Sequence, residues 1–226
     1  LQFTGPVDIS YGSDVKLCRG ADIVVLTAGA HQAQGETRLD LVGKNAAIFR
    51  KLIPQISRYA KGAIFLVVSN PVDVLTYLTF KYSKFPWQRV IGSGTILDTA
   101  RFRYLLGDHF NVDPDSVHAY ILGEHGDSEF PVWSTANIAG IPLSKFKSWS
   151  KAKMNKVFLK TRKSAYEIIA KKGATYYAIG LGICEIVAAI LKDKQQVLPV
   201  SSLLSGYNGV SNVSLSVPCV IGRSGI

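Results

Sequence analysis

One histidine lies in surroundings that suit proton transfer. His125 belongs to the run Gly-Glu-His-Gly-Asp at residues 123–127, where a strand-like alternation over 117–122 ends in a glycine-flanked turn. Histidine is the side chain whose ordinary pKa lets it exchange a proton near neutral pH. The position therefore predicts a general acid or base acting on a reacting oxygen.

A carboxylate and a guanidinium accompany it in a stretch with helical spacing. Asp98 and Arg101 are three residues apart within 97–110, so both share one helix face, while Arg103 points about 200° away from Arg101. The planar fork of Arg101 suits a carboxylate bound through two hydrogen bonds. The alternative is a surface ion pair, worth about 0.2–0.5 kcal/mol.

The elements that must hold these side chains alternate between strand and helix. Short apolar runs at 21–30, 63–68 and 90–94 predict strands buried on both faces, and amphipathic stretches between them predict helices. This order predicts an α/β fold, half of a doubly wound parallel sheet. Ala28 and Gly29 follow the first strand and would let a dinucleotide approach the backbone, although Gly29 could equally be an ordinary turn glycine.

Four motifs follow one another along the chain. They are Gly-Glu-Thr-Arg at 35–38, Ser-Asn-Pro-Val-Asp at 69–73, Leu-Asp-Thr-Ala-Arg-Phe-Arg at 97–103, and the histidine motif at 123–127. Together they resemble the L-lactate dehydrogenases of the lactate/malate dehydrogenase family. The resemblance covers nearly the whole chain and implies NAD as cofactor.

The resemblance implies a role for each catalytic side chain. His125 would be the acid and base, with Asp98 supporting its imidazolium form. Arg38 would swing in from a lid and polarise the substrate carbonyl, and Arg101 would hold the substrate carboxylate. Gln32 would face the variable side chain of the substrate.

The remaining site residues also follow from the resemblance. Asn70 would hydrogen-bond both nicotinamide and substrate, Ser93 would line the nicotinamide pocket, and Thr175 would pack beside the substrate. Ala28 and Gly29 would contact the cofactor.

The substrate expected from Gln32 is pyruvate or L-lactate. An arginine there would pair with the second carboxylate of oxaloacetate, whereas an amide leaves that charge unpaired in a closed site. A malate dehydrogenase or another 2-hydroxy acid dehydrogenase is the alternative within the family. A serine hydrolase is disfavoured because no G-x-S-x-G elbow occurs.

We expect two regions and an incomplete record of a longer chain. Residues 1–92 read as the C-terminal part of an NAD-binding Rossmann domain whose G-x-G-x-x-G unit is missing. Residues 93–226 read as an α+β substrate and catalytic domain without its final helix. A catalytically incompetent fragment is therefore a further alternative.

A second anion site is implied at Arg103 and His118. Allosteric bacterial members of the family carry an arginine and a histidine at the matching positions, where fructose 1,6-bisphosphate binds across a subunit interface. The alternative makes His118 a half-buried strand residue and Arg103 a rim cation. A homo-oligomer, a tetramer by resemblance, is expected.

Composition bears on other partners. The formal net charge is +10, but the lysines of 145–172 lie opposite an apolar stripe, which favours a solvated helix face over a nucleic-acid site. The apolar stretch ending at Leu191 is short and carries Glu185, so we expect no membrane span. The three cysteines lack zinc-ligand spacing, and no metal is expected. The absence of a signal peptide suggests a cytoplasmic protein.

Overall fold

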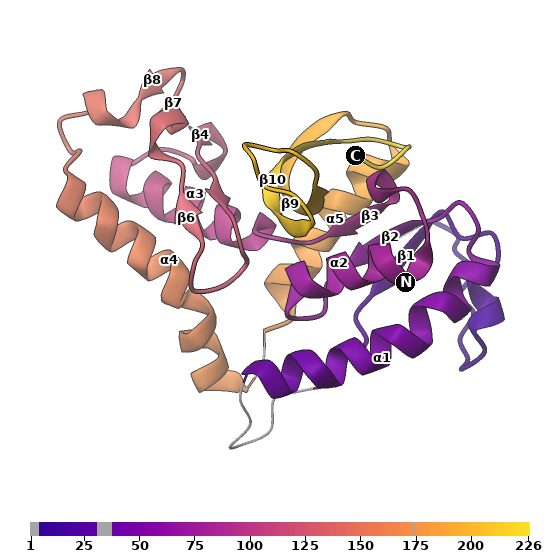
Figure 1. Cartoon of the computed structure of the whole chain (residues 1–226). Helices are drawn as coiled ribbons and strands as arrows, with labels where there is room; N and C mark the ends of the chain where they lie inside the picture. The colour runs from indigo at the N-terminus through magenta and orange to yellow at the C-terminus, as the bar shows by residue number, and fades with distance from the viewer. Residues whose placement is uncertain (1–4, 31–37, 174) are drawn as a thin grey trace.

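A mixed sheet of five strands forms the centre of the molecule. The computed structural model describes residues 5–30, 38–173 and 175–226. The strands are β1 (Ile23–Leu26), β2 (Ile64–Val67), β3 (Val90–Gly92), β9 (Gln196–Leu204) and β10 (Val213–Ile221), in the spatial order β1-β2-β3-β9-β10. The first three are parallel, as the alternating pattern predicted, and β9 and β10 join them as an antiparallel hairpin (Figure 1).

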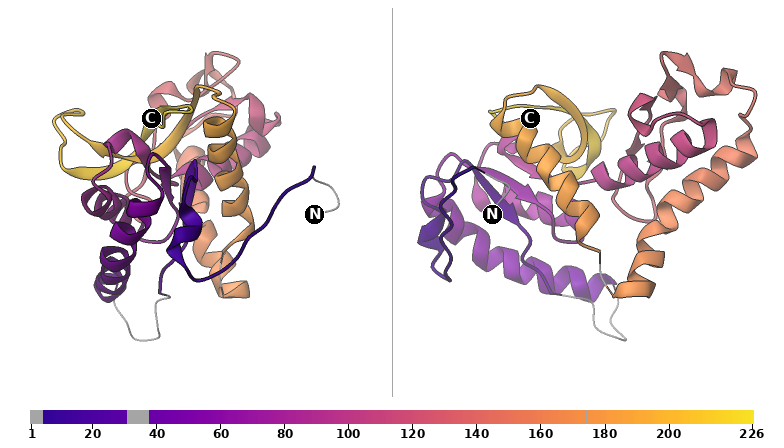
Figure 2. Two further views of the ribbon diagram at one scale, coloured as in Figure 1. Left: turned by 90° about the vertical axis from the view of Figure 1, so that its right-hand side faces the viewer. Right: turned by 180° about the vertical axis from the view of Figure 1, so that it is seen from behind.

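Helices cover both faces of this sheet. The long helices are α1 (Arg38–Tyr59), α2 (Val72–Ser83), α3 (Ile96–Phe110), α4 (Lys151–Lys172) and α5 (Tyr177–Leu191). α1 and α2 bury one face through a cluster that includes Phe49, Phe65 and Leu75, and α5 buries the other through Ile186 and Ile190 (Figure 2). All four residues of β2 are buried, which explains its uninterrupted apolar run.

A second unit carries the histidine motif. Its short strands are β4 (Val117–His118), β5 (Ile121–Leu122), β6 (Phe130–Pro131), β7 (Asn137–Ile138) and β8 (Ile141–Pro142). Across the described residues of the whole chain, short 3₁₀ helices occur at Val15–Cys18, Trp87–Arg89, Pro114–Ser116, Trp133–Thr135 and Leu143–Lys145. A separate core containing Phe102, Leu106 and Met154 joins α3 and α4 to these strands.

The apolar stripe of α4 is only partly packed. Met154 is buried near the start of the helix, but Ile169 near its end is 47% exposed, so the stripe predicted opposite the lysines is packed only toward the start of the helix. The last turns of α4 run past the strands of the second unit (Figure 1). Within the described ranges, no helix is long and apolar enough to span a membrane.

Candidate active site

Helix α3 positions the acid and the arginine predicted from their spacing. Asp98 lies in the first turn and is buried, with its Oδ1 atom 3.6 Å from Nη1 of Arg101. An acid in this turn is also favoured by the helix dipole. The predicted i,i+3 pair is therefore present, and Asp98 has a second oxygen available for another partner.

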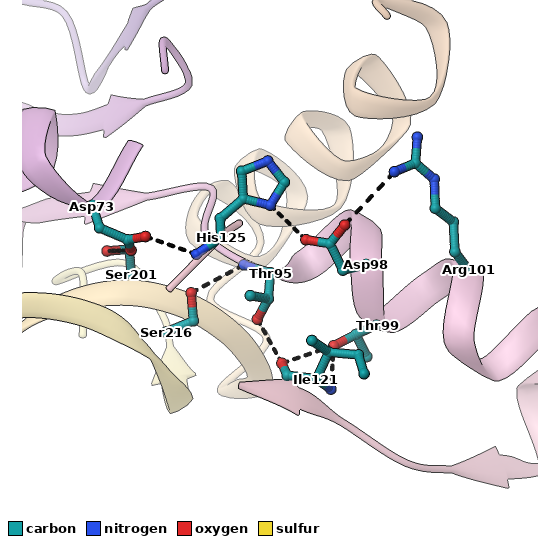
Figure 3. Close-up of polar contacts among 9 residues, drawn as sticks. All are labelled: Asp73, Thr95, Asp98, Thr99, Arg101, Ile121, His125, Ser201 and Ser216. Atoms are coloured by element: carbon teal, nitrogen blue, oxygen red, sulfur yellow. Dashed lines mark hydrogen bonds and ion pairs between the residues drawn. The ribbon is translucent and has the colours of Figure 1, made fainter. Parts of the chain in front are cut away.

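Two threonines at the start of α3 fix the strand that leads to the histidine. Thr95 Oγ1 donates to the carbonyl oxygen of Ile121 at 2.6 Å, and the Ile121 N–H donates to Thr99 Oγ1 at 3.0 Å. The Thr95 N–H donates to Ser216 Oγ at 3.1 Å. These bonds tie β5, and with it the histidine loop, to the same helix turn that carries Asp98 (Figure 3).

The loop after β5 is held from the opposite side by a carboxylate on α2. Gly123 turns the chain with φ of 94°, a conformation that favours glycine. The His125 N–H then donates to Asp73 Oδ2 at 2.8 Å, and Ser201 Oγ of β9 donates to Asp73 Oδ1 at 2.6 Å. Burial raises the pKa of Asp73 despite these two hydrogen bonds. One buried carboxyl group thus connects α2, the histidine loop and β9.

The imidazole of His125 meets Asp98. Its Nδ1 atom lies 2.5 Å from Asp98 Oδ2, and the two side chains point toward each other (Figure 3). Burial alone would lower the pKa of His125, but the hydrogen bond and charge of Asp98 outweigh it and raise the pKa to about 8. With Nδ1–H directed at Asp98, the other ring nitrogen, Nε2, is placed for proton exchange. The arrangement can act as a general acid and base.

Sequence reasoning assigned no role to two carboxyl groups at this site. Asp73 was visible only as the end of the motif at 69–73, and its contact with His125 joins residues 52 positions apart. Glu129 is 5% exposed and lies beside the pair. Burial and the charge of Asp98 raise the pKa of Glu129 to about 8. The sequence offered one signal for the burial of Glu129, because this acid directly precedes the apolar residues Phe130 and Pro131.

The loops that follow β1 and β2 lie together at the carboxyl edge of the sheet. The side chain of Asn45 accepts from the Ala30 N–H and donates to the Asn70 carbonyl oxygen, both at 2.7 Å. Ser69 Oγ donates to the Ala28 carbonyl oxygen at 2.6 Å. Ala28, Gly29 and Asn70 are exposed here, whereas Ser93 is buried in the turn between β3 and α3. This exposed edge of small residues fits a dinucleotide such as NAD.

Arg103 and His118 border one broad cavity. The cavity has a volume of about 1090 Å³ and is also lined by Arg101 and Lys160. Arg103 Nε donates to the Ala119 carbonyl oxygen at 2.9 Å, and its guanidinium lies 4.9 Å from the Tyr120 ring centre. His118 lies in strand β4, as the alternative expected, but it is exposed and not half-buried. Acidic Asp115 and Glu185 also line the cavity, so its charge is mixed.

Two predicted site residues fall outside the described side chains, and no described contact joins a third, Thr175, to His125 or Asp98. Gln32 lies outside the described residues, and so does the side chain of Arg38, whose backbone begins α1. Thr175 is half-buried just before α5.

Two family models match this chain. The model of the NAD binding domain of lactate/malate dehydrogenase matches residues 3–92, and that of the alpha/beta C-terminal domain of lactate/malate dehydrogenase matches residues 95–226. The chain belongs to the lactate/malate dehydrogenase family. Members of this family are NAD-dependent oxidoreductases, and the predicted family, fold and cofactor are thereby confirmed.

Individual relatives within the lactate/malate dehydrogenase family cover the whole chain. An L-lactate dehydrogenase of Acetivibrio thermocellus is 52% identical over 231 residues, which are 100% of this chain and 73% of the relative. An L-lactate dehydrogenase of Synechococcus sp. is 52% identical over 227 residues, or 100% of this chain and 74% of the relative.

Solved structures agree with this membership. The minor L-lactate dehydrogenase from Enterococcus mundtii superposes with a TM-score of 0.91 at 44% identity, over 94% of this chain and 69% of that protein. A lactate dehydrogenase from a Medee basin deep-sea metagenome library gives a TM-score of 0.92, also at 44% identity, over 98% and 72% of the two chains.

Proposed function

We propose that the protein is an L-lactate dehydrogenase that interconverts pyruvate and L-lactate. The observation that carries the proposal is the 2.5 Å contact between His125 and Asp98, found in a chain 52% identical to L-lactate dehydrogenases. The first region, residues 1–92, would hold the cofactor, and residues 93–226 would hold the substrate and the proton donor.

The residues of the site divide the work of pyruvate reduction. When bound, NADH supplies the hydride for the 2-keto carbon. His125 donates its Nε2 proton to the keto oxygen, and Asp98 stabilises the imidazolium before the transfer. Arg101 binds the substrate carboxylate, and Arg38 stabilises the negative charge that develops on the oxygen.

The supporting residues orient the two reactants. Ala28 and Gly29 would let the cofactor approach the exposed edge of the sheet, where Asn70 also lies. Asn70 would hydrogen-bond nicotinamide and substrate, and Ser93 would line the nicotinamide pocket. Thr175 would pack against the methyl group of pyruvate.

Substrate choice is assigned to Gln32. A closed site containing an amide at this position would leave the second carboxylate of oxaloacetate without a cation. Pyruvate, with a methyl group in its place, carries no such cost.

Regulation by fructose 1,6-bisphosphate is assigned to Arg103 and His118. Both side chains border the same cavity, to which Arg101 and Lys160 add positive charge. Two phosphate groups require several cations. The enzyme would be a homotetramer in the cytoplasm.

A single set of assays tests the proposal. NADH oxidation is measured with pyruvate and with oxaloacetate, each with and without fructose 1,6-bisphosphate. We expect turnover that prefers pyruvate and rises with the bisphosphate. A preference for oxaloacetate would favour malate dehydrogenase instead. Turnover that does not change with the bisphosphate would contradict only the regulatory role assigned to Arg103 and His118. No turnover with either keto acid would contradict the proposal as a whole.

A further inference from the structure

A buried carboxyl group, Glu129, lies beside the catalytic pair and has no part in the scheme above. One carboxylate oxygen of Glu129, one of Asp98 and one ring nitrogen of His125 all lie within 4.8 Å of one another. Glu129 is 5% exposed, and its Oε1 atom forms no hydrogen bond within the described part of the chain. A buried carboxylate without a partner is costly, so its charge state needs an explanation.

The geometry determines which of the two acids holds a proton. Asp98 receives the Nδ1–H of His125 and lies 3.6 Å from Arg101, so its negative charge is compensated. Glu129 makes no comparable hydrogen bond with His125 and no comparable ion pair with Arg101. Two carboxylates this close do not both ionise readily, and the proton goes to the less compensated one. Glu129 is therefore the neutral acid of the group near neutral pH.

The short contact between His125 and Asp98 competes with metal binding by the same three groups. Nδ1 of His125 lies 2.5 Å from Asp98 Oδ2, a distance typical of a strong hydrogen bond that shares a proton. A zinc ligand needs a deprotonated nitrogen at about 2.0–2.1 Å from the ion. The contact between His125 and Asp98 therefore favours proton binding over metal binding.

Charged groups from every side act on this cluster. The charges of Asp98 and Arg101 on α3 and of Arg162 on α4 act on Glu129. Asp73 acts on His125 from α2. The acids favour protonation of the cluster, and the two arginines favour its loss of protons.

We propose, on the basis of the dehydrogenase activity above, that Glu129 is a positioning residue acting through His125. Glu129 is a neutral carboxylic acid when the enzyme is ready to reduce pyruvate. At alkaline pH its ionisation holds the proton on His125. Glu129 and His125 then titrate as one coupled group, and the alkaline limit of pyruvate reduction belongs to the group rather than to the histidine alone.

The first test compares pH profiles of wild type, Glu129→Gln and a control, Glu167→Gln. Glu167 is exposed on α4, so its variant undergoes the same loss of charge away from the cluster. The amide of Glu129→Gln resembles the neutral acid, so we expect kcat/KM for pyruvate within about threefold of wild type near neutral pH.

The variants should differ in alkali. Without a negative charge at position 129, His125 loses its proton sooner, and the alkaline midpoint falls by about 0.5–1 pH unit in Glu129→Gln only. Well above that midpoint, pyruvate reduction is about 3–10-fold slower than wild type, while the acid limb of lactate oxidation moves down by the same amount. Equal midpoints in all three proteins, or a loss of kcat at every pH with an unchanged midpoint, would overturn the inference.

A second measurement needs no turnover. Infrared spectroscopy of the wild-type protein should show a protonated carboxyl band near neutral pH that disappears in alkali and is missing in Glu129→Gln. If the band is present and pyruvate is not reduced, the proposed function fails while the protonation of Glu129 stands. If pyruvate is reduced and the band is missing, the inference about Glu129 fails and the dehydrogenase activity stands.

Discussion

At the scale of single residues, Asp98 is the main group that keeps His125 protonated. The pKa of His125 is raised to about 8 because the hydrogen bond and charge of Asp98 outweigh the effect of burial. Pyruvate reduction needs the protonated ring, so it should be present below this pKa and lost as the pH rises through about 8. The same shift stabilises the fold below a pH of 6.5 and stops doing so above about 8.

Replacing Asp98 tests this pairing directly. Asp98→Asn removes the negative charge beside the imidazolium, so the pKa of His125 falls and the alkaline midpoint of kcat/KM moves down. We expect kcat/KM for pyruvate to fall about 100-fold or more near neutral pH. Asp108→Asn is the matched control, because Asp108 is exposed on the same helix. A midpoint that stays at its wild-type position in Asp98→Asn would show that Asp98 does not set it.

Substrate preference also belongs to the scale of one side chain. Gln32→Arg supplies a cation for the second carboxylate of oxaloacetate, so the ratio of kcat/KM values should shift from pyruvate toward oxaloacetate by about 100-fold or more. Steady-state assays with both keto acids measure this ratio. An unchanged ratio would refute the role given to Gln32.

At the scale of elements, the site depends on how α2, α3 and the sheet meet. The sequence predicted the three parallel strands because continuous apolar runs are typical of doubly buried strands, and it predicted α3 from its periodicity. Asp98 and Arg101 were predictable as neighbours because their spacing is local. The contacts of Asp73 and the approach of Glu129 to Asp98 were not predictable, since they depend on packing between distant segments.

Substitution of Asp73 measures how much its hydrogen bonds to His125 and Ser201 contribute to stability and activity. Asp73→Ala leaves the His125 N–H without its acceptor and should cost about 1–3 kcal/mol of stability, with a lower kcat. In Asp73→Asn the amide oxygen can still accept from His125, while the Ser201 hydroxyl can turn and accept from the amide, so the loss should be smaller. Denaturant unfolding and kcat for both variants are the measurements. Equal losses in the two variants would contradict the hydrogen-bonding explanation.

At the scale of the whole molecule, α5 presents large apolar side chains to the surface. Leu181 is 76% exposed and Tyr177 is 77% exposed, while the opposite face of the helix packs on the sheet. Single exposed apolar residues are ordinary, but two such residues one turn apart on one helix favour a protein interface. This surface agrees with the expected homo-oligomer.

A charge on α5 should therefore change the assembly. Leu181→Glu places a carboxylate in the proposed interface, and we expect a smaller species than wild type in analytical ultracentrifugation. Lys61→Glu, a charge change at an exposed position outside this helix, is the control and should sediment as wild type does. Unchanged sedimentation of Leu181→Glu would exclude this part of α5 from the interface.

The hairpin formed by β9 and β10 has a consequence for the order in which a newly made chain becomes active. Asp73, Asp98 and His125 leave the ribosome early, but Ser201 and Ser216, which fasten Asp73 and the start of α3, are 128 and 121 positions beyond their partners. The sheet edge that would bind the cofactor can therefore fold during synthesis. At that stage the elements that hold the histidine loop still lack the hydrogen bonds from Ser201 and Ser216. Competence for proton transfer arrives only when the hairpin has been translated and has docked.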